Sequence, residues 1–260
     1  MTIKTNDLSC GYKNKCVLRN INIELHTGTA VCVLGPNGAG KSTFFKTLLR
    51  QLTPLAGGIT IDGKDISALT LGELARVFAY VPQAKGYAYQ FSVQDMVLMG
   101  RAAHIGRFSG PDKDDILAVQ KAAEALGIQD LLHRRYSELS GGEQQIVLIA
   151  RALAQESAYI ILDEPASNLD FANQSKLLSV IRDLIDSGTG VIMSSHSPSH
   201  AFACCKRTIL INKSEVIYGQ TDDVVSEMNL TNMYGVPIAI LQDKKENGTR
   251  IKACCLKDYE

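Results

Sequence analysis

The order of hydrophobic and polar residues predicts a chain in which short strands alternate with helices. Residues 30–34 and 160–162 are continuous apolar runs rich in β-branched side chains, which is typical of buried strands in a parallel sheet. Residues 191–195 are also strand-like. The segment FFKTLLRQL, residues 44–52, has its apolar residues at helical spacing. This alternation favours the α/β class.

Two further regions depart from that alternation. The sequence INIEL at 21–25 alternates apolar and polar residues and predicts a strand of an antiparallel sheet, and a glycine-led strand is expected at 59–61. From about Phe91 to Leu139 the pattern turns helical, with helix starts expected at Ser92 and at Pro111-Asp112. We therefore expect a β-rich N-terminal region and a helical insertion.

A glycine-rich loop separates the strand 30–34 from the helix 44–52. Its sequence GPNGAGKST fits G-x-x-x-x-G-K-[ST] in the strand–loop–helix context which that phosphate-binding pattern requires. Glycines let backbone N–H groups converge on phosphate oxygens, and the helix adds its positive end. Lys41 then supplies a charge to the β- and γ-phosphates, and Ser42 a hydroxyl ligand for Mg²⁺. The expected ATP-binding residues of this phosphate loop are Gly35, Pro36, Asn37, Gly38, Ala39, Gly40, Lys41, Ser42 and Thr43. The alternative is a glycine-rich turn before an ordinary helix.

A second glycine-rich stretch reads LSGGEQQ from Leu139 to Gln145. Ser140 and Glu143 match a capping box, so one interpretation is a well-capped helix. Glycine weakens a helix by about 1 kcal/mol relative to alanine, so Gly141 and Gly142 argue against a helix start alone. Bare N–H groups at a helix N-terminus make an anion site, to which Ser140 can add a hydroxyl donor. The local pattern leaves both interpretations open.

Two carboxylates follow the buried strand 160–162. Asp163 and Glu164 lie at its carboxyl end, where open α/β sheets bind ligands. Adjacent carboxylates are costly to bury without a cation, and a Mg²⁺ that bridges phosphates meets that need. Asp163 is the expected metal-holding residue, directly or through water. The alternative is a surface carboxylate pair.

The sequences LSGGEQQ and YIILDEP, placed after the phosphate loop, resemble the signature and acidic-strand motifs of ABC-type ATPases, and the resemblance covers essentially the whole chain. It implies an α/β fold with a P-loop NTPase (RecA-like) core, an antiparallel β subdomain and an inserted α-helical subdomain at about 91–150. The whole of 1–260 is expected to be one such domain, with a C-terminal tail at about 220–260. In that family the signature of one subunit closes over ATP held by the other, so the resemblance implies a homodimer. The expected signature residues are Leu139, Ser140, Gly141, Gly142 and Glu143.

The resemblance also implies roles for individual residues. Glu164 matches the general base that polarises the attacking water, and His196 matches the switch histidine that contacts the γ-phosphate. Tyr12 stands where the family has an aromatic residue that stacks on adenine, although a tyrosine in a strand is more often sheet packing. Gln83 matches the glutamine that ligates Mg²⁺ when nucleotide is bound, so the implied metal ligands are Ser42, Gln83 and Asp163.

Further positions match the family in one loop and depart from it at two residues. Residues 167–170 match the loop that crosses to the partner subunit, with Ser167 and Asp170 the expected interface residues. Ser197 follows His196 where the family often has an acidic residue, which leaves the role of the histidine intact but alters how its loop is held. Ala166 similarly stands where threonine is common. A metal site at His196, His200, Cys204 and Cys205 is disfavoured because Pro198 interrupts the histidine pair and adjacent cysteines serve one ion poorly.

Composition narrows the classes of partner. Lys+Arg and Asp+Glu are equal at 27 each, so no net field favours nucleic acid. The seven cysteines form no C-x-x-C pattern and are expected to be reduced cytosolic thiols. The N-terminus does not resemble a signal peptide, and no apolar run approaches the roughly 18 residues that span a bilayer. We therefore expect a peripheral protein at the cytoplasmic face of the membrane, held there by a partner.

In the C-terminal tail, the sequence pattern predicts a helix to about Tyr234 and a hairpin that turns at Asn247-Gly248.

The segment 91–101, with residues 104–107 after it, resembles ATPases of metal-chelate importers. The resemblance implies uptake of an iron–siderophore, haem or cobalamin type of chelate, with a permease that docks between Gln83 and about Arg107 and, indirectly, a substrate-binding protein. Helical core packing is the alternative for this segment. Molybdate- or tungstate-type oxyanion import, export, or a soluble ABC ATPase that acts on DNA or ribosomes are the other functions that remain open.

Overall fold

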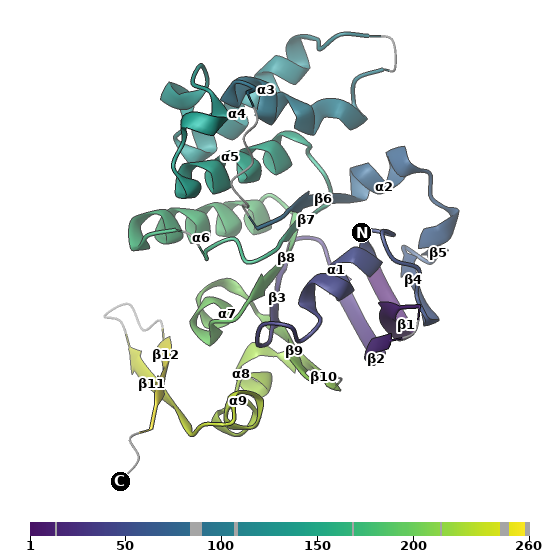
Figure 1. Cartoon of the computed structure of the whole chain (residues 1–260), viewed down its shortest axis with the longest axis vertical. Helices are drawn as coiled ribbons and strands as arrows, with labels where there is room; N and C mark the ends of the chain where they lie inside the picture. Colours follow the sequence, from purple (N-terminus) through teal and green to yellow (C-terminus); the bar gives the residue numbers. More distant parts are fainter. Residues whose placement is uncertain are drawn as a thin grey trace. The chain divides into compact units, whose positions relative to one another are not determined.

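The computed structural model describes residues 1–13, 15–83, 90–106, 109–167, 169–213, 215–244 and 250–257 (Figure 1). The chain forms two compact units. The first combines Met1–Ala68 with Ile192–Glu260, and the second is Leu69–Val191. Each unit contains both strands and helices, as the predicted α/β class requires.

The first unit contains an antiparallel sheet with the strand order β2-β1-β4-β5. Its strands are β1 (Thr2–Tyr12), β2 (Lys15–His26), β4 (Ala56–Ile61) and β5 (Lys64–Asp65). Strand β1 pairs with β2 from Thr2↔His26 to Tyr12↔Lys15 and with β4 along its other edge. This arrangement confirms the antiparallel strand expected at 21–25 and the strand expected at 59–61. A short 3₁₀ turn, η1 (Ile66–Ala68), follows the sheet.

The first unit also contains parallel strands beside the phosphate loop. Strand β3 (Ala30–Leu34) is buried at every position and pairs in parallel with β9 (Arg207–Asn212), from Val31↔Arg207 to Leu34↔Leu210. Strand β8 (Gly190–Ser195) neighbours β3 on the other side, and β10 (Glu215–Gln220) is antiparallel to β9. Helix α1 (Lys41–Leu48) follows β3 with Phe44, Phe45 and Leu48 fully buried. The predicted strand–loop–helix unit is thus present.

The C-terminal part of the first unit is built from short elements. They are α7 (Pro198–Cys204), α8 (Thr221–Val224), α9 (Glu227–Tyr234), β11 (Ile238–Lys244) and β12 (Arg250–Leu256). Helix α9 ends at Tyr234, as expected, because Gly235 takes a left-handed φ of 72° at the C-cap. Strands β11 and β12 pair antiparallel, which confirms a hairpin, and its expected turn at Asn247-Gly248 lies outside the described residues.

The second unit places two parallel strands next to a group of helices. Strands β6 (Phe78–Val81) and β7 (Tyr159–Leu162) pair from Phe78↔Tyr159 to Val81↔Leu162. A Cβ at Gly190 would lie 2.3 Å from the Tyr159 ring, so this close approach requires glycine. The helices are α2 (Leu71–Val77), α3 (Val93–Leu98), α4 (Lys113–Leu126), α5 (Gly141–Ala154) and α6 (Phe171–Asp186), with 3₁₀ turns η2 (Met99–Ala103), η3 (Gln129–Leu131) and η4 (Tyr136–Glu138).

The helix starts in this unit agree with the sequence. Ser92 caps α3 and Asp112 caps α4, each in a reciprocal capping box with the acidic residue three positions later. Helices α3, α4 and α5 contact one another and form the teal part of the chain in Figure 1. Within the described ranges, no helix has the length and apolarity that crossing a membrane demands.

Candidate functional site

The phosphate loop leaves strand β3 at Gly35 and adopts backbone angles that need glycine. The N–H of Gly35 donates to the carbonyl of Ser195 at 3.3 Å, and a Cβ at Gly35 would lie 2.8 Å from the carbonyl oxygen of Ile211. Gly38 and Gly40 have φ values of 80° and 112°, in the left-handed region that side chains avoid. The glycine positions of the motif are therefore explained by close packing at the first and by backbone conformation at the other two.

Lys41 is the first residue of α1, and its side chain turns back over the loop. The Lys41 ammonium donates to the carbonyls of Gly35 at 2.8 Å and Pro36 at 3.2 Å. The residue is only 5% exposed, so this cation is held inside the curve of the loop. Ser42, next along the helix, is exposed. A positive charge fixed in this concave backbone is suited to bind phosphate oxygens.

The acidic strand end belongs to the second unit. Asp163 follows β7, its N–H donates to the carbonyl of Val81 at 2.9 Å, and its carboxylate accepts from the Tyr80 hydroxyl at 3.3 Å. Asp163 is 8% exposed. Glu164 has a φ of 49°, which is uncommon for a residue with a side chain and is found preferentially at functional sites.

Gln83 and Ser167 lie beside Glu164. The Gln83 amide nitrogen donates to the Ser167 hydroxyl at 3.2 Å, and that hydroxyl donates to the Glu164 carbonyl at 3.0 Å. The structure thus brings three of the predicted site residues together in one short chain of hydrogen bonds. Asp170 is the N-cap of α6, where its carboxylate accepts from the Asn173 N–H at 2.8 Å. Asn168, in the same predicted interface loop, lies outside the described residues.

The signature loop begins α5 with a complete capping box. The Glu143 carboxylate accepts from both the backbone N–H and the hydroxyl of Ser140 at 2.8 Å, and the Glu143 N–H donates to the Ser140 hydroxyl oxygen at 3.3 Å. These bonds from the Ser140 backbone and side chain lower the pKa of Glu143. Leu139 is buried, whereas Ser140 and Gly141 are exposed at the helix start. The capped-helix interpretation is therefore confirmed, and phosphate binding here remains a prediction.

Sequence reasoning missed a residue that shapes this loop. The buried amide of Gln144 donates to the carbonyls of Tyr136 at 3.2 Å and Leu139 at 3.3 Å. These bonds hold residues 136–139, which precede the signature loop, against the first turn of α5. No role was predicted from the sequence for Gln144 or Gln145. Both are buried in the structure, where polar side chains are uncommon unless they are hydrogen-bonded.

Tyr12 and His196 both belong to the first unit and are exposed. Tyr12 ends β1 and is 48% exposed, so its ring is available for stacking and is not part of the sheet core. A Cβ at Gly11 would lie 2.2 Å from the carbonyl of Lys15, so glycine before Tyr12 permits the tight hairpin. His196 follows β8, and its carbonyl accepts a hydrogen bond from the hydroxyl of Tyr234, a contact that the sequence did not predict.

The disfavoured metal-site residues make other contacts. Nδ1 of His200 lies 2.9 Å from the Ser195 hydroxyl, and burial, with His196 nearby, lowers the pKa of His200. Sγ of Cys204 lies 3.6 Å from both Met193 Sδ and Cys205 Sγ. Across the part of the chain that the structure describes, no group of three or more His, Cys, Asp or Glu side chains is arranged to hold a metal ion.

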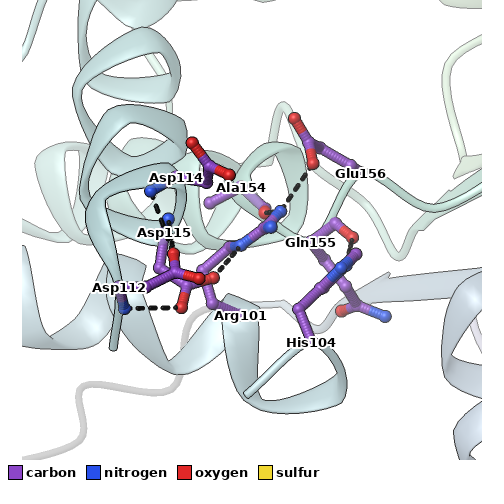
Figure 2. A network of polar contacts seen from close by, with 8 residues as sticks. All are labelled: Arg101, His104, Asp112, Asp114, Asp115, Ala154, Gln155 and Glu156. Carbon is purple, nitrogen blue, oxygen red and sulfur yellow. Dashed lines mark hydrogen bonds and ion pairs between the residues drawn. The ribbon is translucent and has the colours of Figure 1, made fainter. Parts of the chain in front are cut away.

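The segment that follows α3 is anchored to the end of the signature helix (Figure 2). Arg101 is 6% exposed and donates to Asp115 at 2.9 Å, to Glu156 at 2.6 Å and to the carbonyl of Ala154 at 2.8 Å. The Arg101 guanidinium holds the pKa of Asp115 below its usual range. Next to it, Nε2 of His104 lies 2.8 Å from the Gln155 carbonyl. Residues 99–104 and the C-terminal end of α5 are therefore one packed structure, whereas Arg107 lies outside the described residues.

Comparison with known proteins places this arrangement in a family. The family model described as ABC transporter matches residues 18–167, more than half of the chain, from β2 through the phosphate loop, the signature loop and the acidic strand end. The chain belongs to the ABC transporter family. It is an ATP-binding ABC subunit and an ATPase, with the mixed α/β fold of those proteins.

Relatives of this ABC ATPase match it over nearly its whole length. An uncharacterized ABC transporter ATP-binding protein of Haemophilus influenzae is 39% identical over 248 residues, which cover 95% of this chain and 94% of the relative. A hemin import ATP-binding protein of Bordetella avium is 36% identical over 258 residues, covering 96% and 98%. A solved chain of a metal-chelate type ABC transporter in an inward-facing conformation has a TM-score of 0.87 and 31% identity, covering 99% and 98%.

Proposed function

We propose that this ABC ATPase energises uptake of a metal chelate through a partner permease, by hydrolysing ATP at two sites shared between two copies of the chain. The observation that carries the proposal is the full-length similarity to a hemin import protein and to a metal-chelate type transporter. An iron chelatin transport ATP-binding protein of Helicobacter pylori, 33% identical over 249 residues, supports the same cargo class. The short segment 91–101, which suggested this class from the sequence, is consistent with it.

The first unit supplies the nucleotide-binding half of the proposed site. The phosphate loop cradles the triphosphate with backbone N–H groups, and Lys41 neutralises its β- and γ-oxygens. The exposed Tyr12 ring offers a face on which adenine stacks, an interaction worth about 1–3 kcal/mol per base. The fixed left-handed glycines support this role because the loop needs little reorganisation to receive the anion.

Oxygen ligands suited to Mg²⁺ come from three of the predicted residues. The Ser42 hydroxyl, the Gln83 amide oxygen and the Asp163 carboxylate form the donor set that this hard cation prefers. Asp163 lies nearly buried at the carboxyl end of a strand, where open α/β sheets bind ligands, and its carboxylate oxygens are of the kind that Mg²⁺ prefers, so its position fits a cation. When bound, the ion neutralises charge that develops on the β- and γ-phosphates.

Glu164 is the proposed general base, and His196 the proposed partner of the γ-phosphate. The Glu164 carboxylate accepts a proton from the attacking water, and the His196 imidazole donates a hydrogen bond to the γ-phosphate. Ser140 and the two glycines after it face the ATP of the other copy, and Asp170 and Ser167 organise the contact between copies. A two-fold homodimer fits this scheme because self-complementary pairing is the commonest oligomeric form.

The proposed permease binds the surface that starts at Gln83 and includes residues 91–106. Residues 99–104 are hydrogen-bonded to the end of α5, the helix that begins at the signature loop. This supports the proposal because a movement of the docked segment would be transmitted to α5. We infer that the subunit works at the cytoplasmic face of the membrane, with a substrate-binding protein delivering cargo on the opposite side. Import of a molybdate-type oxyanion is the second candidate, since a molybdate import ATP-binding protein of Haemophilus influenzae is 36% identical over 223 residues.

Two experiments test the proposal. Glu164→Gln should keep ATP binding and slow phosphate release by about 10²–10⁴-fold, the usual contribution of general base catalysis. Near-normal turnover in that variant would reject Glu164 as the base. For cargo, vesicles that contain this ATPase together with the permease that copurifies with it should take up haem or a ferric siderophore, and not molybdate, when ATP is supplied on the side of the ATPase. Uptake of molybdate alone would move the assignment to the oxyanion class.

A further inference from the structure

The loop around His196 is held from inside at the preceding residue. Ser195 is 3% exposed, and its hydroxyl oxygen accepts from the Ser197 N–H at 2.9 Å and lies 2.9 Å from Nδ1 of His200. The Ser195 hydroxyl also lies 3.2 Å from the Ser197 carbonyl. These contacts fix how the backbone leaves β8, in a chain where Ser197 replaces the acidic residue expected at that position.

A residue from the C-terminal tail holds the same loop from outside. Tyr234 is the last residue of α9, and its hydroxyl donates to the carbonyl of His196. Burial, with smaller contributions from the thiols of Cys254 and Cys32, raises the pKa of Tyr234 to about 12. Its hydroxyl therefore stays protonated and able to donate at any physiological pH. The His196 carbonyl is fixed while the residue remains exposed.

Helix α9 is itself firmly placed, so Tyr234 is a fixed donor. Leu230 and Met233 are buried on its inner face. The Glu227 carboxylate accepts from the Ile240 N–H at 2.8 Å and from the Lys257 ammonium at 2.7 Å, which joins α9 to strand β11 and to the residue that follows β12. The tail thus has a direct and well-anchored contact with the backbone of the proposed switch residue.

We propose that Tyr234 is a positioning residue for ATP hydrolysis: its hydrogen bond to the His196 carbonyl holds the histidine backbone so that the imidazole meets the γ-phosphate. This inference rests on the proposed function of His196. A misplacement of about 1 Å in a reacting group can cost about 10²-fold in rate, so backbone support of this kind affects the chemical step. In this role the Tyr234 hydroxyl acts on the histidine backbone and not on the nucleotide. We therefore expect its loss to change the rate of hydrolysis and to leave ATP affinity unchanged.

The test compares Tyr234→Phe with a matched loss of a tyrosine hydroxyl in the same unit. Tyr218 donates in the same way to the backbone carbonyl of Glu24 at 2.5 Å, in the β-strand region. We expect Tyr234→Phe to lower kcat for ATP about two- to tenfold, the range that one hydrogen bond supplies, with KM unchanged. Tyr218→Phe should leave both constants at the wild-type value. Urea unfolding of both variants shows whether they are equally folded.

A second pair of variants separates failure of this inference from failure of the proposed function. His196→Ala should lose most of the turnover, and adding Tyr234→Phe to it should cause no further loss, because the hydroxyl acts only through the histidine. If Tyr234→Phe keeps the wild-type kcat while His196→Ala is inactive, the positioning role is wrong and the histidine assignment stands. If His196→Ala retains full turnover, the histidine assignment fails and the positioning role fails with it.

Discussion

Two helices of this ABC ATPase begin at glycine-rich loops, and their first turns are built in opposite ways. Helix α1 starts after Gly40, which has a left-handed φ of 112° and no side chain to cap the helix. Helix α5 starts after Ser140, whose hydroxyl and backbone exchange hydrogen bonds with Glu143. In the phosphate loop the backbone itself is shaped to receive an anion, and no N-cap side chain competes for the site. In the signature loop the Ser140 hydroxyl already donates a hydrogen bond to the Glu143 carboxylate.

This difference suits the unequal roles that we propose for the two glycine-rich loops. The phosphate loop needs no change of hydrogen bonds at its N-cap to receive ATP, so it suits binding within one chain. In the proposed site, Ser140 would share or exchange its bond to Glu143 when a phosphate approaches, which suits the proposed contact with the ATP of a second chain. Variants of the two loops test the contrast, beginning with the largest expected effect.

Lys41→Met should weaken ATP binding about ten- to hundredfold, because charge-assisted hydrogen bonds contribute about 1.5–3 kcal/mol. Titration calorimetry with dilute protein measures the dissociation constant. Ser140→Ala at the same protein concentration is the control and should bind ATP as the wild type does. Equal losses of affinity in the two variants would remove the proposed distinction between the loops.

Ser140→Ala should lower ATP turnover at least about tenfold, because the proposed hydroxyl donor to the phosphate of the other copy is lost. Loss of the cap should also lower the free energy of unfolding by about 1 kcal/mol. Phosphate release and urea unfolding measure the two effects. Ser92→Ala removes the same kind of cap from α3 and should show the stability loss alone. Matching turnover losses in both variants would mean that the cap, and not the phosphate contact, matters.

Alanine at the glycines of the two loops should separate conformational from ligand requirements. Gly40→Ala should destabilise the fold by about 1–3 kcal/mol, because its φ is left-handed and the new Cβ would lie 2.7 Å from a Val17 methyl group. Gly141→Ala meets no atom within 4 Å and should change stability by less than about 1 kcal/mol. Urea unfolding ranks the two. If Gly141→Ala still loses ATP turnover, the glycine serves the nucleotide; full turnover would argue against close approach of phosphate there.

The smallest effect concerns acid stability. Hydrogen bonds from Ser140 lower the pKa of Glu143 in the folded state, so its contribution is fully present above the unfolded pKa and is lost as pH falls through the folded value. The wild type should therefore lose more stability than Glu143→Gln between about pH 5 and 3, by less than about 1 kcal/mol after solvent screening. Urea unfolding at several pH values measures the difference. Parallel curves for the two proteins would contradict the assigned cap energetics.

The local features of this molecule were predictable from its sequence. The strand–loop–helix unit around Lys41 follows from a continuous apolar run, three glycines and a helical pattern, all of which act between near neighbours. The caps at Ser92, Asp112 and Ser140 were predictable for the same reason, since a capping box needs only residues three apart. The phosphate-loop residues and Asp163 follow from such short motifs, whereas Tyr12, Gln83 and His196 were named only because the chain resembles ABC-type ATPases.

Contacts between distant segments were not predictable. Tyr234 lies 38 residues from His196, and Glu156 lies 55 residues from Arg101. Each hydrogen bond depends on how whole helices pack, and neither tyrosine nor arginine signals its partner in a single sequence. The buried amide of Gln144 is a similar case, because its partners become apparent only when the approach to α5 is folded.

The left-handed backbone at Glu164 has a consequence for how this protein changes under selection. A residue with a Cβ in that conformation costs about 1–2 kcal/mol, whereas glycine adopts it freely. Replacing Glu164 with glycine would thus relieve this backbone strain and also remove the carboxylate that we propose as the general base. At this position, the substitution that raises stability would lower the proposed catalytic activity. Selection for heat resistance alone would therefore favour variants that hydrolyse ATP poorly.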